Sequence, residues 1–278
     1  MRRRALASGR SSVRIAGCVA LVTGAAEGVG RGFLEALLEG SARRVYASAR
    51  NPAALLDLAK LDPDRVVALK LDVTSAEDRR RAAGTARDVT LLINNAGISG
   101  SADGRERRFL AAASLDDARR VMETDFFAQA EICRTFTPAL IRADAAAVVN
   151  ILSIGALFCT PAFATYSAAK AAAAMMTQGI RAELLPHGVL VMAVYTAGVR
   201  TRMSAGPLRP MVSPIEHARE VLAAVEAGTE TVFAGAGAEA LHAEFLRDPV
   251  AFVRHRVAGF AAALDPSELK SRYFGDRP

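Results

Sequence analysis

Short apolar runs alternate with longer stretches of helical periodicity along most of the chain. Each run spans four to six residues, and in the segment that follows it the apolar residues recur every three or four positions. This alternation predicts βα units and a parallel sheet. Seven strands are predicted, at Val19–Thr23, Val45–Ser48, Val66–Leu71, Val89–Asn94, Ala147–Leu152, Val189–Val194 and Thr231–Ala234.

Residues typical of helix ends separate these strands. Gly40 follows the first helix, Pro52 suits the first position of the second, and Ser75 with Asp78 resembles a capping box. Right-handed crossovers place the helices on both faces of one sheet, and no linker-like composition interrupts the pattern. We therefore predict a single α/β domain over residues 15–278. Its helices are expected over Arg31–Glu39, from Asn51, from Ser75 toward Ala86, over Leu115 to about Phe136, over Tyr166–Leu185 and over Pro214–Ala227. An amphipathic stretch from Glu239 to about Leu264 is expected to pack on the sheet or to cover the substrate pocket.

The composition excludes several classes of protein. With 51% hydrophobic and 23% charged residues in 278, the chain resembles neither a disordered nor a fibrous protein. The cysteines Cys18, Cys133 and Cys159 lie far apart in no ligand spacing, so neither a disulfide framework nor a metal site is expected. No apolar run is long enough for a membrane span or a secretory signal, and a cytoplasmic protein is predicted.

The formal charge of +6 is concentrated at the N-terminus. Residues 1–14 hold five arginines and no acid, which leaves the remaining chain near +1. We predict a disordered basic arm over 1–14. Because a nucleic-acid-binding face would spread its Lys and Arg residues over the fold, no nucleic-acid partner is expected.

The first sign of chemistry is a glycine-rich segment. The first strand is joined to its helix by Thr23-Gly24-Ala25-Ala26-Glu27-Gly28-Val29-Gly30. Glycines permit a tight turn and bring backbone N–H groups against a pyrophosphate, which also gains from the positive end of the helix. A dinucleotide is therefore expected at Gly24, Ala26, Glu27, Gly28, Val29 and Gly30.

Arg50 indicates which dinucleotide binds. Sites for NAD(H) place an acid about 20 residues beyond the glycines, where it binds the ribose 2′-hydroxyl. Arg50 stands twenty residues after Gly30, with Ala49 before it. A guanidinium can fork onto a 2′-phosphate, so NADP(H) is favoured over NAD(H). Glu27 argues the other way, because it would lie near the same phosphate.

Other strand ends are expected to contact the adenosine moiety. Asp72, followed by Val73, ends the third strand and would touch the adenine ring. Asn94, Ala96 and Gly97 at the end of the fourth strand would line the ribose. A polar residue in such a position can also serve only to cap a turn.

The candidate catalytic residues are Ser153, Tyr166 and Lys170. Tyr166 and Lys170 are four residues apart on one helical face, and Ser153 ends the preceding strand, so the three groups can converge. A nearby ammonium lowers the pKa of a phenol from about 10, which would make Tyr166 a usable proton donor or acceptor. Ser153 would hydrogen-bond the substrate oxygen as negative charge develops on it. This spacing alone is also common in surface pairs.

Taken together, these segments resemble the classical short-chain dehydrogenase/reductase family from about Gly17 to Ala234. The match rests on the glycine-rich segment, on Asn94-Asn95-Ala96-Gly97, and on Ser153 thirteen residues before Tyr166-Ser167-Ala168-Ala169-Lys170. The resemblance implies a Rossmann-like, doubly wound, mostly parallel seven-stranded sheet and hydride transfer between a nicotinamide and a carbonyl or alcohol carbon. It also implies a homodimer or homotetramer. Thr201, with Val199 before it, matches a family residue that contacts the nicotinamide end.

Two departures from the family pattern bear on efficiency. The helix asparagine that completes a proton relay through water in the family is Asp125 here, a carboxylate that can still hold water. The family's Pro-Gly turn after the sixth strand is replaced by Thr196-Ala197. The histidines, His217 among them, show no metal spacing and are expected in surface or packing roles.

These observations predict an NADP(H)-dependent oxidoreductase that interconverts a ketone and a secondary alcohol on a small to medium, largely apolar molecule. The loops Ile98–Ser114, Gly155–Phe163 and Gly198–Ser213 would shape its pocket, with Leu157, Phe158, Phe163 and Leu208 as apolar residues. A dehydratase, cyclase or isomerase on the same fold, and a non-catalytic NADP(H)-binding protein, remain alternatives.

Overall fold

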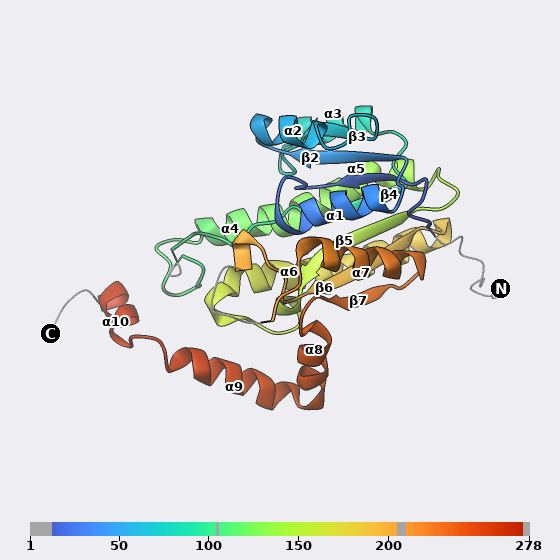
Figure 1. Ribbon diagram of the computed structural model, residues 1–278. Coiled ribbons are helices and arrows are strands. Elements are labelled where there is room, and N and C mark those ends of the chain that lie inside the picture. The colour runs from blue at the N-terminus through green and yellow to red at the C-terminus, as the bar shows by residue number, and fades with distance from the viewer. Residues whose placement is uncertain (1–12, 104–105, 205–209, 275–278) are drawn as a thin grey trace, which may run out of the picture.

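In a computed structural model, which describes residues 13–103, 106–204 and 210–274, the predicted strands form one sheet (Figure 1). Within these residues the sheet has seven strands in the order β3-β2-β1-β4-β5-β6-β7, and all neighbours are parallel. The seven-stranded, doubly wound, Rossmann-like sheet is confirmed. The strands are β1 (Val19–Val22), β2 (Arg44–Ala49), β3 (Val66–Lys70), β4 (Leu91–Asn94), β5 (Ala147–Ser153), β6 (Leu190–Thr196) and β7 (Thr231–Ala234).

The strand order defines where a ligand can bind. From β1 the chain winds outward through β2 to β3 and then returns to β4 on the other side of β1. The connections that leave β1 and β4 therefore diverge, and a crevice opens at the carboxyl ends of these two strands.

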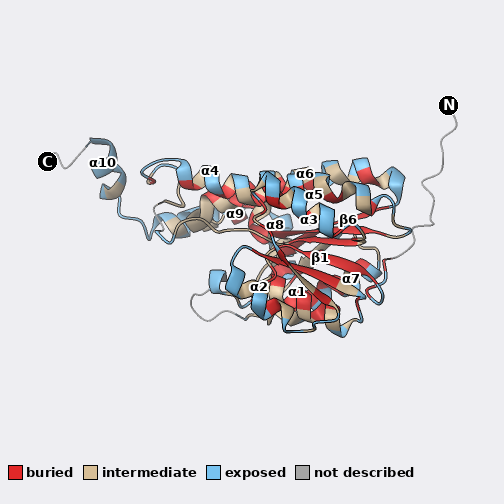
Figure 2. Ribbon diagram, turned by 90° about the horizontal axis from the view of Figure 1, so that it is seen from above, coloured by how far each residue is buried: buried red, intermediate tan, exposed pale blue. Residues whose placement is uncertain are grey.

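Helices cover both faces of the sheet, as Figure 2 shows with the buried strands between two layers. One face carries α1 (Gly28–Glu39), α2 (Pro52–Ala59) and α7 (Pro214–Glu226), and the other carries α3 (Ala76–Thr85), α4 (Asp116–Met122), α5 (Ala128–Leu140) and α6 (Ala164–Leu184). Two apolar clusters result. Phe33 and Val221 lie in the core on the α1 side, and Ile132 and Phe136 lie in the core on the α5 side.

The long helix predicted over Leu115 to about Phe136 is interrupted. Between α4 and α5 lies a π-helical turn, η1 (Glu123–Phe127), and α5 continues to Leu140. A π turn inserts one extra residue into a helix and re-aims the side chains on it, and such turns are frequent at functional sites. This turn carries Asp125.

The amphipathic stretch predicted over Glu239 to about Leu264 is two helices. These are α8 (Ala238–Arg247) and α9 (Pro249–Ala261), separated at Asp248, whose carboxylate accepts a hydrogen bond from the N–H of Ala251 at 2.9 Å. Phe252 of α9 is buried against Phe158 of the main body. A third helix, α10 (Ser267–Phe274), follows.

Figure 1 shows α8 following β7, α9 leading away from α8, and α10 lying on the side of the molecule where the loop before α4 is. The contact is polar: Arg108 and Glu268 form an ion pair of 2.6 Å, and Tyr273 donates its hydroxyl hydrogen to the Leu110 carbonyl oxygen at 3.1 Å. The C-terminal helices therefore hold the β4–α4 loop, as well as packing on the body.

Most of the predicted basic arm, residues 1–12, lies outside the described residues. Val13 and Ile15 are buried in the core, and the Ile15 N–H donates to the Glu226 carboxylate at 2.9 Å. The packed core thus includes Val13, which was assigned to the arm, as well as Ile15, the first residue of the predicted domain.

No helix in the described part of the chain combines the length and the apolar character that crossing a bilayer requires. Among the same residues, no cluster of His, Cys, Asp and Glu side chains has the arrangement of a metal site.

Candidate active site

A cleft of about 1000 Å³ opens at the carboxyl ends of the central strands. Its walls come from the turn after β1, the ends of β2 to β6, η1 and the start of α6. Most of the predicted site residues line it: Gly24, Ala26, Glu27, Gly28, Val29, Arg50, Asp72, Val73, Ala96, Gly97, Asp125, Ser153, Tyr166, Lys170, Val199 and Thr201. The fold thus brings together residues that are nearly 180 positions apart.

The glycine-rich turn is shaped for a group that approaches the backbone. Gly24 and Gly28 have φ values of +66° and +56°, which favour glycine. Gly30 does not line the cleft. A side-chain carbon on Gly30 would lie 2.1 Å from the Gly24 carbonyl oxygen, so this glycine lets α1 approach the turn.

The amino end of α1 is open to an anion. Its N-cap, Glu27, makes no side-chain capping hydrogen bond, and its first turn holds no acid. The N–H groups at a helix start have no partner within the helix and carry its positive dipole end, the arrangement that binds phosphate. The turn and helix therefore fit the pyrophosphate of a dinucleotide.

Asn94, the last residue of β4, and Asn95, which follows it, have roles that differ from the prediction. Asn94 is 3% exposed, and its side-chain amide donates to Asn150 Oδ1 at 2.9 Å. The prediction that Asn94 lines the ribose is wrong for its side chain, which points into the core. Asn95 lies in the cleft wall and its Nδ2 donates to the Thr23 carbonyl oxygen at 2.9 Å.

Asn95 is thus a structural member of the site that the sequence interpretation missed. The motif that signalled it was present, but periodicity along a strand cannot tell which of two adjacent asparagines faces the sheet core. Thr23 completes the tie, because its Oγ1 accepts the N–H groups of Asn95 and Ala96 at 2.9 and 3.0 Å.

At the adenosine end, Arg50 and Asp72 lie in the wall of the cleft. Asp72 accepts hydrogen bonds from the N–H and hydroxyl of Thr74 at 2.9 and 2.7 Å, so it also caps a turn. Arg50 has no carboxylate partner among the residues that the structure describes. Glu27, which argued against a phosphate here, forms an ion pair of 2.6 Å with Arg202 that offsets its charge.

The centre of the cleft holds a buried charge cluster. Lys170 Nζ lies 3.1 Å from Asp125 Oδ2 and donates to the Ile151 carbonyl oxygen at 3.1 Å. Asp125 Oδ1 accepts the N–H of Ile98 at 2.8 Å. The Lys170 ammonium also lies 5.6 Å from the centre of the Tyr166 ring.

These contacts set the protonation of the pair. Burial lowers the pKa of Lys170, but the charges of Asp125 and Tyr166 outweigh it, so the pKa is raised and Lys170 stays an ammonium. Burial raises the pKa of Tyr166, and Asp125 adds to this, whereas Lys170 and a hydrogen bond with Ser153 lower it. The net pKa of Tyr166 is raised. Lys170 does lower this pKa, as predicted, but burial of the phenol, with Asp125 adding to it, outweighs the ammonium.

Ser153 stands at the end of β5, where its hydroxyl accepts the Gly155 N–H at 3.1 Å. Across the sheet it pairs in register with Thr196, the last residue of β6. Thr196 Oγ1 lies 3.1 Å from Nε2 of His217, a fully buried histidine on α7. The packing role expected of His217 is confirmed. Thr196, which stands where the family has proline, is hydrogen-bonded to this histidine.

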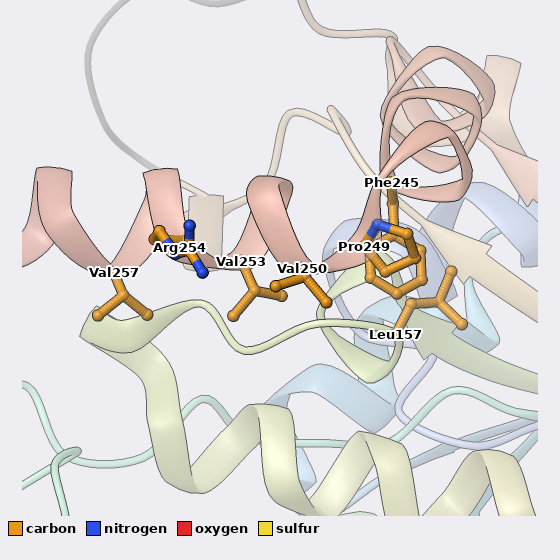
Figure 3. Close-up of a pocket in the computed structure, with 7 residues that line it drawn as sticks. All are labelled: Leu157, Phe245, Pro249, Val250, Val253, Arg254 and Val257. Carbon is orange, nitrogen blue, oxygen red and sulfur yellow. The ribbon is translucent and has the colours of Figure 1, made fainter.

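The substrate end departs from the expected apolar lining. Phe163 lines the cleft, but Phe158 packs against Phe252 and Phe245, and Leu208 lies outside the described residues. Leu157 faces a separate hollow of about 510 Å³ beside α9 (Figure 3). The lining of that hollow is almost wholly apolar, with Arg254 as its charged residue, so the candidate acid-base groups all belong to the larger cleft.

Comparison with known proteins agrees with this geometry. Residues 18–209 match the family model for short chain dehydrogenases. The chain is 33% identical over 204 residues to galactitol 2-dehydrogenase (L-tagatose-forming) of Cereibacter sphaeroides, which covers 70% of this chain and 76% of that protein. It is 31% identical over 196 residues to an NADPH-dependent 1-acyldihydroxyacetone phosphate reductase of Schizosaccharomyces pombe, covering 69% of this chain and 63%, less than two thirds, of that protein.

Solved structures extend the similarity. A short chain dehydrogenase from Burkholderia cenocepacia J2315, solved in complex with NADP, is 41% identical with a TM-score of 0.77 and covers 91% of this chain and all of that one. A short-chain dehydrogenase from Streptomyces avermitilis is 26% identical with a TM-score of 0.69, covering 92% and 98% of the two chains. The protein belongs to the short-chain dehydrogenase family.

Proposed function

We propose that this protein is an NADP(H)-dependent oxidoreductase that interconverts a ketone and a secondary alcohol on a small to medium-sized molecule. The observation that carries the proposal is the buried cluster of Tyr166, Lys170 and Asp125 in the same cleft as Ser153 and the open end of α1. A nucleotide-binding turn and a proton-transfer group share one cavity, as hydride transfer requires.

The cofactor would be held along the first half of the cleft. The N–H groups at the start of α1 suit the pyrophosphate, and Asp72 with Val73 borders the place for the adenine. Arg50 suits a 2′-phosphate, and the Glu27–Arg202 ion pair reduces the repulsion that Glu27 would exert. The NADP complex of the Burkholderia relative and the NADPH-dependent relative support the same preference.

Bound nicotinamide supplies a hydride in reduction and accepts one in oxidation. In reduction Tyr166 donates its hydroxyl proton to the carbonyl oxygen, and Ser153 donates a hydrogen bond to the same oxygen. Lys170 stabilises the resulting phenolate, since the Asp125 carboxylate keeps it protonated. The raised pKa of Tyr166 keeps the phenol protonated at neutral pH, which suits the reducing direction.

Other properties stay predictions. Ile98, Phe163 and Met203 offer apolar surface to the body of a substrate. Assembly into a homodimer or homotetramer and a cytoplasmic location follow from the family resemblance and the composition, and neither is tested by the arrangement of the site.

A panel of ketones and secondary alcohols with NADPH, NADH and their oxidised forms tests the proposal through the absorbance of the reduced nicotinamide. Turnover that Tyr166→Phe lowers by about a thousandfold, within the range for loss of a general acid, supports it. Tyr46→Phe is the control, because the Tyr46 hydroxyl is hydrogen-bonded to Asp88 outside the cleft. Product formed without consumption of nicotinamide, or tight NADPH binding without conversion of any compound, would contradict it.

A further inference from the structure

Arg107 occupies the substrate end of the cleft. It belongs to the loop between β4 and α4 and contributes to the cleft wall. Its guanidinium carbon lies 4.3 Å from the centre of the Phe163 ring, and its carbonyl oxygen accepts the Thr165 N–H at 3.3 Å. Arg107 therefore lies beside the segment that leads directly into Tyr166.

The other cations of the cleft wall differ from Arg107 in their partners. Arg120 is paired with Asp117, Lys170 with Asp125 and Arg202 with Glu27, and Arg50 lies at the adenosine end. Arg107 forms no ion pair with any residue that the structure describes, and its Nε is buried without a hydrogen-bond partner.

Asp117 lies close to the Arg107 side chain but is paired with other groups. A side-chain carbon built on Gly100 would meet both Asp117 Oδ2 and Arg107 Cγ, at 2.7 and 2.9 Å, so the Arg107 stem passes close to Asp117. The Asp117 carboxylate is already used by Arg120 and by the Ser101 N–H, the latter at 2.9 Å. Among the residues that the structure describes, the Arg107 guanidinium thus has no carboxylate partner, and it can accept an anion from outside the protein.

The loop that carries Arg107 is fixed from the other side by α10. The ion pair of Arg108 with Glu268 is 2.6 Å long, and its side chains are only 17% and 18% exposed. Arg272 donates to the Ala113 carbonyl oxygen at 2.9 Å and Tyr273 to that of Leu110 at 3.1 Å. The backbone next to Arg107 is thus held in place before a ligand arrives, and the guanidinium itself lies against the Phe163 ring, which reduces the entropy that binding costs.

We infer that Arg107 binds an anionic group, a carboxylate or a phosphate, of the carbonyl substrate. An arginine keeps its charge in proteins, and leaving that charge unpaired and partly desolvated costs free energy. A guanidinium forks onto the two oxygens of either anion. The inference rests on the proposed function and narrows its substrate to a ketone or alcohol with an apolar body and one anionic group.

Calorimetric titration of the full chain saturated with NADP⁺, which prevents reduction of the carbonyl, tests the inference. The probes are phenylglyoxylate against its methyl ester, and dihydroxyacetone phosphate against dihydroxyacetone. Wild type should bind the anion of at least one pair about tenfold or more tighter than its neutral counterpart, as expected for a charge-assisted hydrogen bond. Arg107→Gln should remove that preference and leave binding of the neutral compound unchanged.

Two further variants separate binding from folding of the loop. Arg107→Lys keeps the charge and should retain part of the preference, and Arg119→Gln removes a charge from the exposed side of α4 and should behave as wild type. Equal binding of anion and neutral compound by wild type, equal weakening of both by Arg107→Gln, or binding of neither anion would overturn the inference. Preference for the carboxylate or the phosphate pair identifies the anion.

Turnover with NADPH distinguishes this failure from failure of the proposed function. Reduction of neutral ketones without preference for anions would leave the oxidoreductase standing and remove the role of Arg107. Binding of an anion through Arg107 without oxidation of NADPH would support the role of Arg107 and contradict the proposed oxidoreductase activity.

Discussion

The two ends of the cleft are built in different ways. At the adenosine end, Arg50 and Asp72 each lie within two residues of the end of a strand, and the Asp72 carboxylate accepts hydrogen bonds from Thr74 in the turn that follows. At the substrate end the wall is a long loop whose position depends on a helix far along the chain, through the ion pair of Arg108 with Glu268.

The difference concerns what each end recognises. Backbone N–H groups at a helix start bind phosphate whatever the surrounding side chains, so the first end can stay the same for any substrate. The second end is lined by loop side chains such as Arg107 and Phe163, and we expect the choice of substrate to be made there. Asp125 and Lys170 lie between the two.

The largest effect is expected where the two ends meet. Asp125→Ala leaves the buried Lys170 ammonium without its carboxylate and should lower the free energy of unfolding by about 3–5 kcal/mol. Urea unfolding measures it, with Asp116→Ala as the control, because that carboxylate pairs with Arg119 on the surface. A loss below 1 kcal/mol would show that Asp125 and Lys170 are not paired in the folded protein.

Asp125→Asn keeps an acceptor for the Ile98 N–H but removes the negative charge that raises the pKa of Tyr166. Reduction requires protonated Tyr166, so its rate falls as pH rises through that pKa. The alkaline limb of kcat/KM should therefore move to lower pH in this variant. An unchanged or upward-shifted limb would contradict the effect of Asp125 on the phenol.

The buried His217, which lies next to Thr196, is expected to make the stability of the fold depend on pH. Burial lowers the pKa of His217 to about 4, so as pH falls below about 6.5 the unfolded chain takes up a proton that the folded chain resists. Stability that is present at pH 7 should be lost progressively toward pH 4, by about 2 kcal/mol at pH 5 from this residue. His217→Leu should remove that portion of the pH dependence in urea unfolding, and the exposed His187→Leu should not. An unaltered slope would show that His217 is not buried as described.

At the adenosine end, Arg50→Ala should weaken NADPH binding about tenfold or more and leave NADH binding within about twofold, because only NADPH carries the phosphate. Fluorescence titration of both cofactors measures this, with the exposed Arg80→Ala as control. Equal losses for the two cofactors, or tighter NADH binding by wild type, would remove the assignment of Arg50.

The smallest effect tests the long-range support of the other end. Glu268→Gln breaks the ion pair with Arg108 and should raise KM for the carbonyl substrate about threefold, in keeping with the modest value of such pairs, while NADPH binding stays the same. Glu239→Gln on the exposed side of α8 is the control. A change in NADPH binding without a change in KM would contradict the claim that this ion pair supports only the substrate end of the cleft.

The same contrast decides what could be predicted from the sequence. The seven strands and the glycine-rich turn follow from local pattern, and the four-residue spacing of Tyr166 and Lys170 brings them to one side of a helix. The π turn at Asp125 could not be predicted, because apolar periodicity continues through it. Arg107 was missed because its significance lies in the absence of a partner among the described residues, which only the folded arrangement reveals. The direction of the Tyr166 pKa shift depended on burial of the phenol and on the nearby Asp125 carboxylate, and the spacing of residues along the chain shows neither.

The most direct test of the account follows the hydride itself. NADPH deuterated at the reactive nicotinamide carbon is incubated with a ketone that the enzyme reduces, and the product is examined by mass spectrometry and NMR. The account predicts an alcohol with deuterium on the former carbonyl carbon, formed by wild type and Tyr46→Phe and nearly absent with Tyr166→Phe. A product without deuterium, or equal labelling by the Tyr166 variant, would contradict it.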